Sequence, residues 1–253
     1  MGLGEHFSEL RRRLGRAAIG VLVGAVAGWF ASEPVLALLR TPVLESARAQ
    51  DRAVVINFPS ISAAFDLRME VAIIVGIVIS SPIWLYQLFA FFVPALSKRE
   101  KRYVYGFVLS ALPLFIAGCA AGMWVMPHIV QLMTGFAPQF TASYLDASAY
   151  FDFILKLTLV TGVAFVLPLF VVVLNFAGVV SGRTVTHAWR WALMGICLFT
   201  AIATPAADVM SMLLLAAPMI ALYVAACGVS LLNDRRRERR LSAAVYPVLT
   251  ADD

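Results

Sequence analysis

Two acidic side chains, Glu9 and Glu100, stand among basic residues beside long apolar runs. Glu9 is followed by three consecutive arginines, and Glu100 lies between two pairs of basic residues. A carboxylate forms charge-assisted and often bidentate hydrogen bonds with a guanidinium group. On a helix, Glu9 and Arg13 have the i,i+4 spacing of an ion pair, which contributes only about 0.3–0.5 kcal/mol. Considered alone, each carboxylate is therefore typical of a solvated surface charge.

The other residue types that carry chemistry form no recognisable site. The cysteines and histidines are scattered, without CxxC or CxxH spacing, over Cys119, Cys197, Cys227, His6, His128 and His187. An odd cysteine count without a pattern indicates neither a disulfide framework nor a metal site. No apolar run contains the paired aspartates, Ser/His pair or HExxH motif of an intramembrane protease. We expect no metal, no cofactor and no enzymatic activity.

The composition is that of a polytopic α-helical membrane protein. Of 253 residues, 61% are hydrophobic and 14% are charged, with a mean hydropathy of +0.86. A soluble domain has about 25% charged residues and must cover its surface with polar groups. A membrane β-barrel would show alternating segments of about ten residues, whereas this chain has long unbroken apolar runs. These features exclude a soluble enzyme, a disordered chain and a nucleic-acid-binding domain.

Six apolar runs approach the length of about 20 residues that a membrane-crossing helix needs. They cover residues 17–31, 71–92, 103–126, 153–174, 185–203 and 209–232. We expect one six-helix domain over residues 1–240 and a cytoplasmic tail over 241–253. Prolines recur within or beside these runs and predict kinked helices, at Pro82, Pro94, Pro113, Pro168 and Pro218.

The distribution of Lys and Arg predicts the orientation. Fifteen of them lie in the N-terminal tail, the second and fourth connections and the C-terminal tail. The opposite side has few basic residues, namely Arg40, Arg48, Arg52 and Arg68, with Lys156 nearby. Both termini are therefore expected in the cytoplasm of a bacterium, with the long first and third connections outside the plasma membrane and carrying short helices. The first apolar run shows no cleavage site and is interpreted as a retained helix.

Residues 204–208, Thr-Pro-Ala-Ala-Asp, predict a tight reversal after the fifth run. Pro205 cannot continue the preceding helix, and Asp208 can cap the following one. From Trp191 to Ala203 the run is thirteen residues, or about 20 Å. A longer helix that begins at Val185 is the alternative.

The interior of the runs holds only mild polarity. No Asp, Glu, Lys, Arg or His falls near the middle of any of the six. Ion-coupled transporters usually need ionisable groups at that depth. A small-solute secondary transporter is therefore the alternative function, and a passive membrane scaffold is a second alternative.

Several motifs in order resemble the TatC family, the multi-spanning subunit of the twin-arginine protein translocase. The first two are HFSELRRRL at residues 6–14 and SPIWLYQ, continued by FFVPALSKREKR, over residues 81–102. The resemblance continues to about residue 232 through Asp146 with Tyr150, the GVAF segment 162–165 followed by Pro168, and Thr204, Pro205, Asp208 and Pro218. Six spans with both ends in the cytoplasm also fit this family.

The resemblance implies a receptor for signal peptides that carry two consecutive arginines. It assigns the contacts with those arginines to Glu9 and Glu100, supported by Arg11, Phe91, Pro94 and Arg102. The surrounding basic residues would compete for both carboxylates, or would repel peptides that pair badly. The resemblance also assigns outer loops and helix ends that shape the complex to Phe65, Asp146, Tyr150, Pro168 and Asp208.

By the same resemblance, the partners are signal peptides of folded precursors, TatA- and TatB-like single-span proteins and membrane lipids, in an oligomeric complex. The chain departs from the family pattern at Val166, where many members have Glu or Gln. It also departs at Glu70, at Val224 and in the extra residue of the 204–208 reversal.

Overall fold

The computed structural model describes residues 3–49, 54–58, 60–92, 101–135, 143–204 and 209–249. Within these residues the fold is helical apart from one pair of short strands. The elements in order are α1 Leu3–Ala49, β1 Val54–Asn57, α2 Ala63–Ile79, α3 Ser81–Phe92, α4 Lys101–Gly135, β2 Ser143–Asp146, α5 Ala147–Phe176, α6 Gly182–His187, α7 Trp189–Ala203 and α8 Val209–Leu249.

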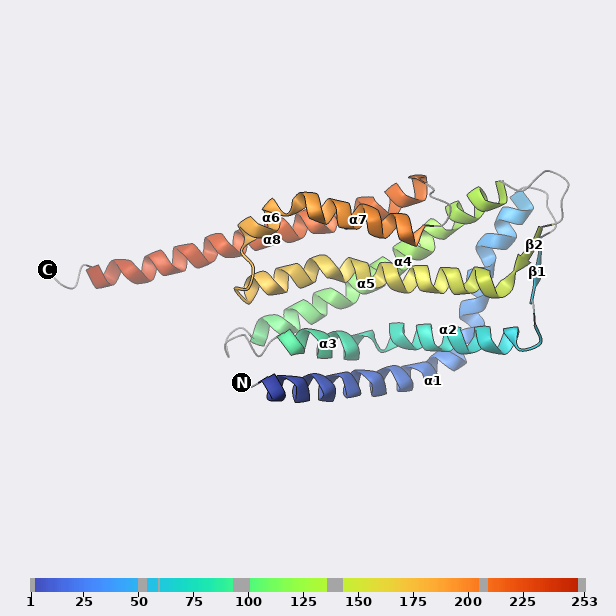
Figure 1. Ribbon diagram of the computed structural model, residues 1–253, viewed down its shortest axis with the longest axis horizontal. Coiled ribbons are helices and arrows are strands. Elements are labelled where there is room, and N and C mark those ends of the chain that lie inside the picture. Colours follow the sequence, from blue (N-terminus) through green and yellow to red (C-terminus); the bar gives the residue numbers. More distant parts are fainter. Residues whose placement is uncertain are drawn as a thin grey trace.

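The helices form an elongated bundle (Figure 1). Helices α2 and α3 follow one another beside the N-terminal part of α1, α4 crosses α5, and α7 lies against α8. The two chain ends lie at one end of the bundle, together with the end of α3, the start of α4 and the turn between α5 and α6. We call this the inner end. The strands and the C-terminal part of α1 lie at the opposite, outer end.

Four helices are long and apolar enough to cross a membrane. Their qualifying segments are Phe7–Thr41, Gly106–Ile129, Ala147–Phe176 and Val209–Arg239. The bent pair of α2 and α3 counts as a fifth if it is one span, and α7 is a shorter apolar helix. Five of the six predicted runs fall on these long helices or on the bent pair, although α1 extends far beyond the predicted 17–31. The remaining run, 185–203, begins in α6 and continues through α7.

The predicted run 71–92 is broken, because α2 and α3 meet at an angle of 57°. Pro82 lies in the first turn of α3 and has no N–H to continue the helix ladder. The backbone N–H of Ser80 closes α2, and the Trp84 indole donates to the Ile77 carbonyl oxygen at 2.9 Å. The kink predicted at this proline is confirmed, and the tryptophan supplies a hydrogen bond at the break.

The predicted run 185–203 is also divided, at Ala188. Helix α6 ends at His187, and α7 has 15 residues, or about 22 Å. The alternative prediction of a single helix that begins at Val185 is therefore wrong. The apolar helix before the reversal is the shorter one, α7. Ser181 begins α6 because its hydroxyl accepts a hydrogen bond from the Thr184 N–H at 3.2 Å.

The outer connections contain strands where short helices were expected. β1 and β2 pair in parallel, with Val54 opposite Ser143 and Asn57 opposite Asp146. The β-branched run at residues 54–56 favours this conformation. The pair joins two connections that are distant in the sequence, next to the outer end of α1.

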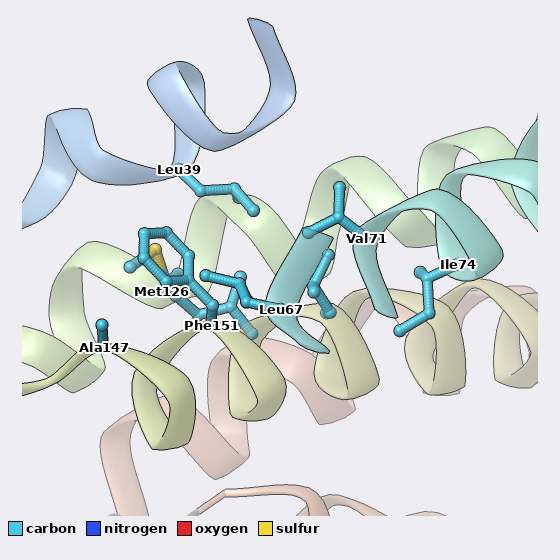
Figure 2. Packing of buried hydrophobic residues seen from close by; sticks show 9 residues of the cluster. Leu39, Leu67, Val71, Ile74, Met126, Ala147 and Phe151 are labelled. Carbon is cyan, nitrogen blue, oxygen red and sulfur yellow. The ribbon is translucent and has the colours of Figure 1, made fainter. Parts of the chain in front are cut away.

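The buried core of the outer half gathers side chains from four helices (Figure 2). The cluster consists of Leu39, Leu67, Val71, Ile74, Met126, Ala147, Phe151, Ile154 and Leu155. Tyr150 adds a polar tie, since its hydroxyl donates to the Leu39 carbonyl oxygen at 3.1 Å. This cluster holds α5 to the C-terminal part of α1, with α2 and α4 packed between and beside them.

Close contact between α1 and α2 depends on glycines. A Cβ atom built on Gly24, Gly28 or Gly76 would lie well inside 3.0 Å of the facing backbone, a distance that real Cβ atoms essentially never show. Small residues at helix interfaces let backbones approach closely in membranes. This contact fixes the axis of α1, and with it the position of Glu9 near the N-terminal end.

Candidate functional site: the inner ends of α1, α3 and α4

Glu9 lies in the second turn of α1 and pairs with Arg13 of the same helix. The Arg13 Nη2 and Nε atoms both donate to Glu9 Oε1, at 2.6 and 3.0 Å. The Arg13 and Glu9 side chains are only 22% and 28% exposed. The i,i+4 ion pair predicted from the sequence is confirmed, but the interpretation of Glu9 as a solvated charge is too simple because the pair is largely shielded.

The surroundings of this pair are apolar on one side of α1. Phe7, Leu10 and Leu14 recur at helical spacing and are exposed. Farther along the same helix, a Cβ on Gly20 would lie 2.9 Å from the Ile83 side chain of α3. Glu9 thus offers a guanidinium-binding carboxylate next to exposed apolar surface, on a helix that runs alongside α3.

The other predicted residues of the peptide site are described unequally. Arg11 is exposed on α1, and Phe91 is half-buried in the last turn of α3. Arg102 lies in the first turn of α4, where the structure describes only the backbone. Pro94 and Glu100 lie outside the described residues. The inner ends of α1, α3 and α4, which carry or adjoin all of these positions, lie at the same end of the molecule (Figure 1).

The residues predicted to shape the outer face occupy packing positions where they are described. Phe65 is 60% exposed and lies edge-on to Trp29, with ring centroids 6.1 Å apart. The Arg68 guanidinium lies 4.6 Å from the centroid of the same Trp29 ring and donates to the Ser32 hydroxyl. Tyr150 bonds to α1, as described above.

Three further predicted positions complete this account. Pro168 is buried inside α5. Asp146 lies in β2, where only the backbone is described. Asp208 and the rest of the predicted reversal, apart from Thr204 with its extended backbone, lie outside the described residues.

A polar network at the inner end was not predicted. Asn175, which is 2% exposed, donates to Asp234 Oδ1 at 2.9 Å and to the Val180 carbonyl oxygen at 3.0 Å. Asp234 Oδ2 accepts from the Gly182 N–H at 2.6 Å, and Asn233 donates to Asn175 at 3.0 Å. The network ties the end of α5 and the start of α6 to α8. Its only sequence signal is an asparagine directly after an apolar run.

Val166 lies at a position where a polar residue is common in the family that the sequence resembles. It is 6% exposed and belongs to a buried cluster with Leu85, Phe89, Ala111, Phe115, Cys119 and Val173. Valine suits this environment because a buried polar group without a partner would cost free energy. Among the residues that the structure describes, no group of three His, Cys, Asp or Glu side chains could hold a metal ion.

Comparison with known proteins agrees with this architecture. The chain matches the family model described as "TatC: Sec-independent protein translocase protein (TatC)" over residues 5–218. It is 42% identical to the Sec-independent protein translocase protein TatC of Xylanimonas cellulosilytica, over 96% of this chain and 88% of the relative. It is 32% identical to the protein of the same name from a Synechocystis species, over 90% and 87%.

The fold is also similar to a solved structure, described as "Crystal Structure of Twin Arginine Translocase Receptor- TatC". The TM-score is 0.75 at 28% sequence identity, and the match covers 90% of this chain and 99% of that chain. The chain therefore belongs to the TatC family of Sec-independent protein translocase proteins.

Proposed function

We propose that this chain is the receptor for twin-arginine signal peptides and the core subunit of a translocase that exports folded proteins across the bacterial plasma membrane. The observation that carries this proposal is the shielded Glu9 carboxylate, which already accepts two hydrogen bonds from a guanidinium group. Family membership and the similarity to a solved twin-arginine translocase receptor support it.

The chemistry of the site favours arginine as its ligand. A guanidinium group is planar, permanently charged and more weakly hydrated than an ammonium group. Partial burial strengthens a charge-assisted hydrogen bond relative to one in open water. Glu9 takes one arginine of the signal peptide, and Glu100 takes the other. Phe91 and Pro94 provide apolar contacts, while Arg11 and Arg102 orient the carboxylates.

The proposed topology has six crossings with both termini in the cytoplasm. The six are α1, the bent pair of α2 and α3, α4, α5, α7 and α8. The position of both termini at the inner end supports an even number of crossings (Figure 1). The inner end also carries Arg11, Arg12, Arg13 and Arg16 of α1, Arg183 of α6 and the arginine tract of α8, as expected for a cytoplasmic face.

The proposed partners are TatA- and TatB-like single-span proteins and further copies of this chain. Large apolar side chains on α7 and α8 are exposed and suit lipid or a neighbouring helix, among them Trp191, Leu198, Ile202 and Val224. Helix α7 is about 8 Å shorter than the hydrocarbon thickness of about 30 Å, so lipids must adapt beside it. Phe65, Asp146, Tyr150, Pro168 and Asp208 are proposed to hold the outer ends and α5 in the shape that assembly requires.

The buried polarity of the described helices does not favour the secondary transporter. The buried polar residues of the described helices have hydroxyl or amide side chains, not ionisable ones, namely Ser32, Ser80, Ser81, Thr161, Asn175, Thr200, Ser211 and Ser230. Hydroxyl groups inside membrane helices are typical of helix packing.

The proposal is tested with photocrosslinkers at Leu10 and Lys101, beside the two carboxylates. A precursor with a twin-arginine signal peptide should be labelled much more strongly than its twin-lysine variant. Glu9→Gln and Glu100→Gln should each reduce labelling and export of a folded precursor, with unchanged amounts of the protein in the membrane. Glu33→Gln, an exposed carboxylate on the outer half of α1, is the matched control. Equal labelling of both precursors would contradict the receptor function.

A further inference from the structure

We infer that Arg13 is a built-in competitor for Glu9, which occupies the carboxylate in the empty receptor and lowers its affinity for signal-peptide arginines. This inference rests on the proposed function, since it concerns the same carboxylate. The i,i+4 spacing already distinguished Arg13 as a possible partner of Glu9, and the inference adds the effect of that pair on peptide binding.

The first support is geometric. Arg13 directs two donors, Nε and Nη2, to a single oxygen of Glu9, at 3.0 and 2.6 Å. Both side chains are more than 70% shielded from solvent. Because the partners lie one turn apart on the same helix, no translational entropy is lost when they pair. The internal arginine therefore engages the carboxylate with the same chemical group that a peptide arginine would use.

The second support is selectivity among the arginines of the flank. Arg11, Arg12 and Arg16 are exposed, and within the described part of the chain none of them forms an ion pair. Arg12 is the natural reference because it is adjacent to Arg13 and carries the same charge. Any effect specific to pairing with Glu9 should therefore separate Arg13 from Arg12.

The consequence follows from competition at one site. A peptide cation that requires Glu9 must first displace Arg13, so the apparent dissociation constant is the intrinsic value divided by the fraction of receptors in which Glu9 is unpaired. This factor is the same for a peptide with two arginines and for one with two lysines. Arg13 therefore weakens both equally and leaves their ratio unchanged. Weaker binding keeps the twin-lysine peptide below saturation, so the intrinsic preference for arginine is expressed as a difference in occupancy.

The test is a binding titration of the full-length protein in lipid nanodiscs with fluorescent twin-arginine and twin-lysine signal peptides. Arg13→Gln should bind both peptides more tightly than Arg12→Gln, by a common factor of roughly two to ten, the range between an exposed helical ion pair and a shielded one. Arg13→Lys should fall between Arg13→Gln and the unmodified protein. Each variant is compared after its thermal unfolding has been measured, so that a loss of folded protein is not mistaken for weak binding.

The outcomes separate this inference from the proposed function. If Glu9→Gln leaves twin-arginine binding unchanged, Glu9 is not the receptor carboxylate and the proposed function fails. If Glu9→Gln weakens binding but Arg13→Gln binds no more tightly than Arg12→Gln, the competition is refuted and the receptor remains. Weaker binding of Arg13→Gln than of Arg12→Gln would also overturn it, because Arg13 would then position the carboxylate. In Glu9→Gln, the additional Arg13→Gln change should give no tightening beyond that of Arg12→Gln.

Discussion

Replacement of Gly76 by alanine should loosen the contact between α1 and α2. A Cβ atom at this position would lie 2.4 Å from the Ala25 backbone nitrogen and 2.5 Å from the Ala25 Cα atom, whereas ordinary contact begins at 3.4 Å. The two helices must therefore separate by about 1 Å, because the obstructing atoms belong to the backbone and cannot rotate away. Overpacking of this kind costs about 1–3 kcal/mol. The better helix propensity of alanine offsets up to about 1 kcal/mol of this cost, which leaves a net loss of about 0–2 kcal/mol. A glycine-to-alanine change at an open helical position shares that gain, so it should differ from Gly76→Ala by the full cost of about 1–3 kcal/mol.

The measurement is unfolding of the purified protein from mixed micelles by SDS, followed by circular dichroism and tryptophan fluorescence. Gly195→Ala is the control, because nothing lies within 4 Å of the Cβ position on this glycine of α7. The control should be neutral or slightly stabilising. The pair Gly24→Ala and Gly76→Ala should lose less stability together than the two losses added, since both separate the same helices. Equal stability of Gly76→Ala and Gly195→Ala would refute the reasoning.

Three further changes probe other contacts. Tyr150→Phe removes the hydrogen bond to the Leu39 carbonyl oxygen and should lower the free energy of unfolding by about 1 kcal/mol in the same assay. An unchanged free energy of unfolding would mean that this bond contributes nothing to stability. Asp234→Ala removes the carboxylate that Asn175 and the Gly182 N–H contact, so trypsin should cleave faster within the arginine tract of α8. An unchanged cleavage rate would show that the network does not hold this helix. Val166→Glu places a carboxyl group in the cluster of Phe89 and Phe115 and should lower the free energy of unfolding by at least about 1–3 kcal/mol. Unchanged stability would show that the position is open to water or to polar partners.

The sequence predicted the helices of this fold well because hydropathy reports which segments prefer lipid. Each of the six apolar runs lies on a helix or helix pair, and the break at Pro82 follows from a missing N–H. Hydropathy does not report where a helix ends. Helix α1 continues through Glu33, Arg40 and Glu45 to Ala49 because its hydrogen-bond ladder propagates into segments with polar side chains.

The features that were missed depend on contacts between distant segments. The strand pair joins residues 54–57 to residues 143–146, and four-residue strands leave little periodicity to detect. The Asn175–Asp234 network connects positions nearly sixty residues apart, so neither side chain predicts the other. At the candidate site the sequence predicted the Glu9–Arg13 spacing, but spacing alone does not report how far the pair is shielded from solvent.

The arginine tract near the C-terminal end lies on α8, a single helix of 41 residues that is about 60 Å long. A flexible basic tail would average its charge over many orientations. Here Arg235 and Arg239 lie on the same side of one helix. Asp234, directly before the tract, accepts a hydrogen bond from the Gly182 N–H at the start of α6. The direction in which these charges point is consequently set by the membrane-embedded helices. A rotation of α8 about its own axis would change that direction.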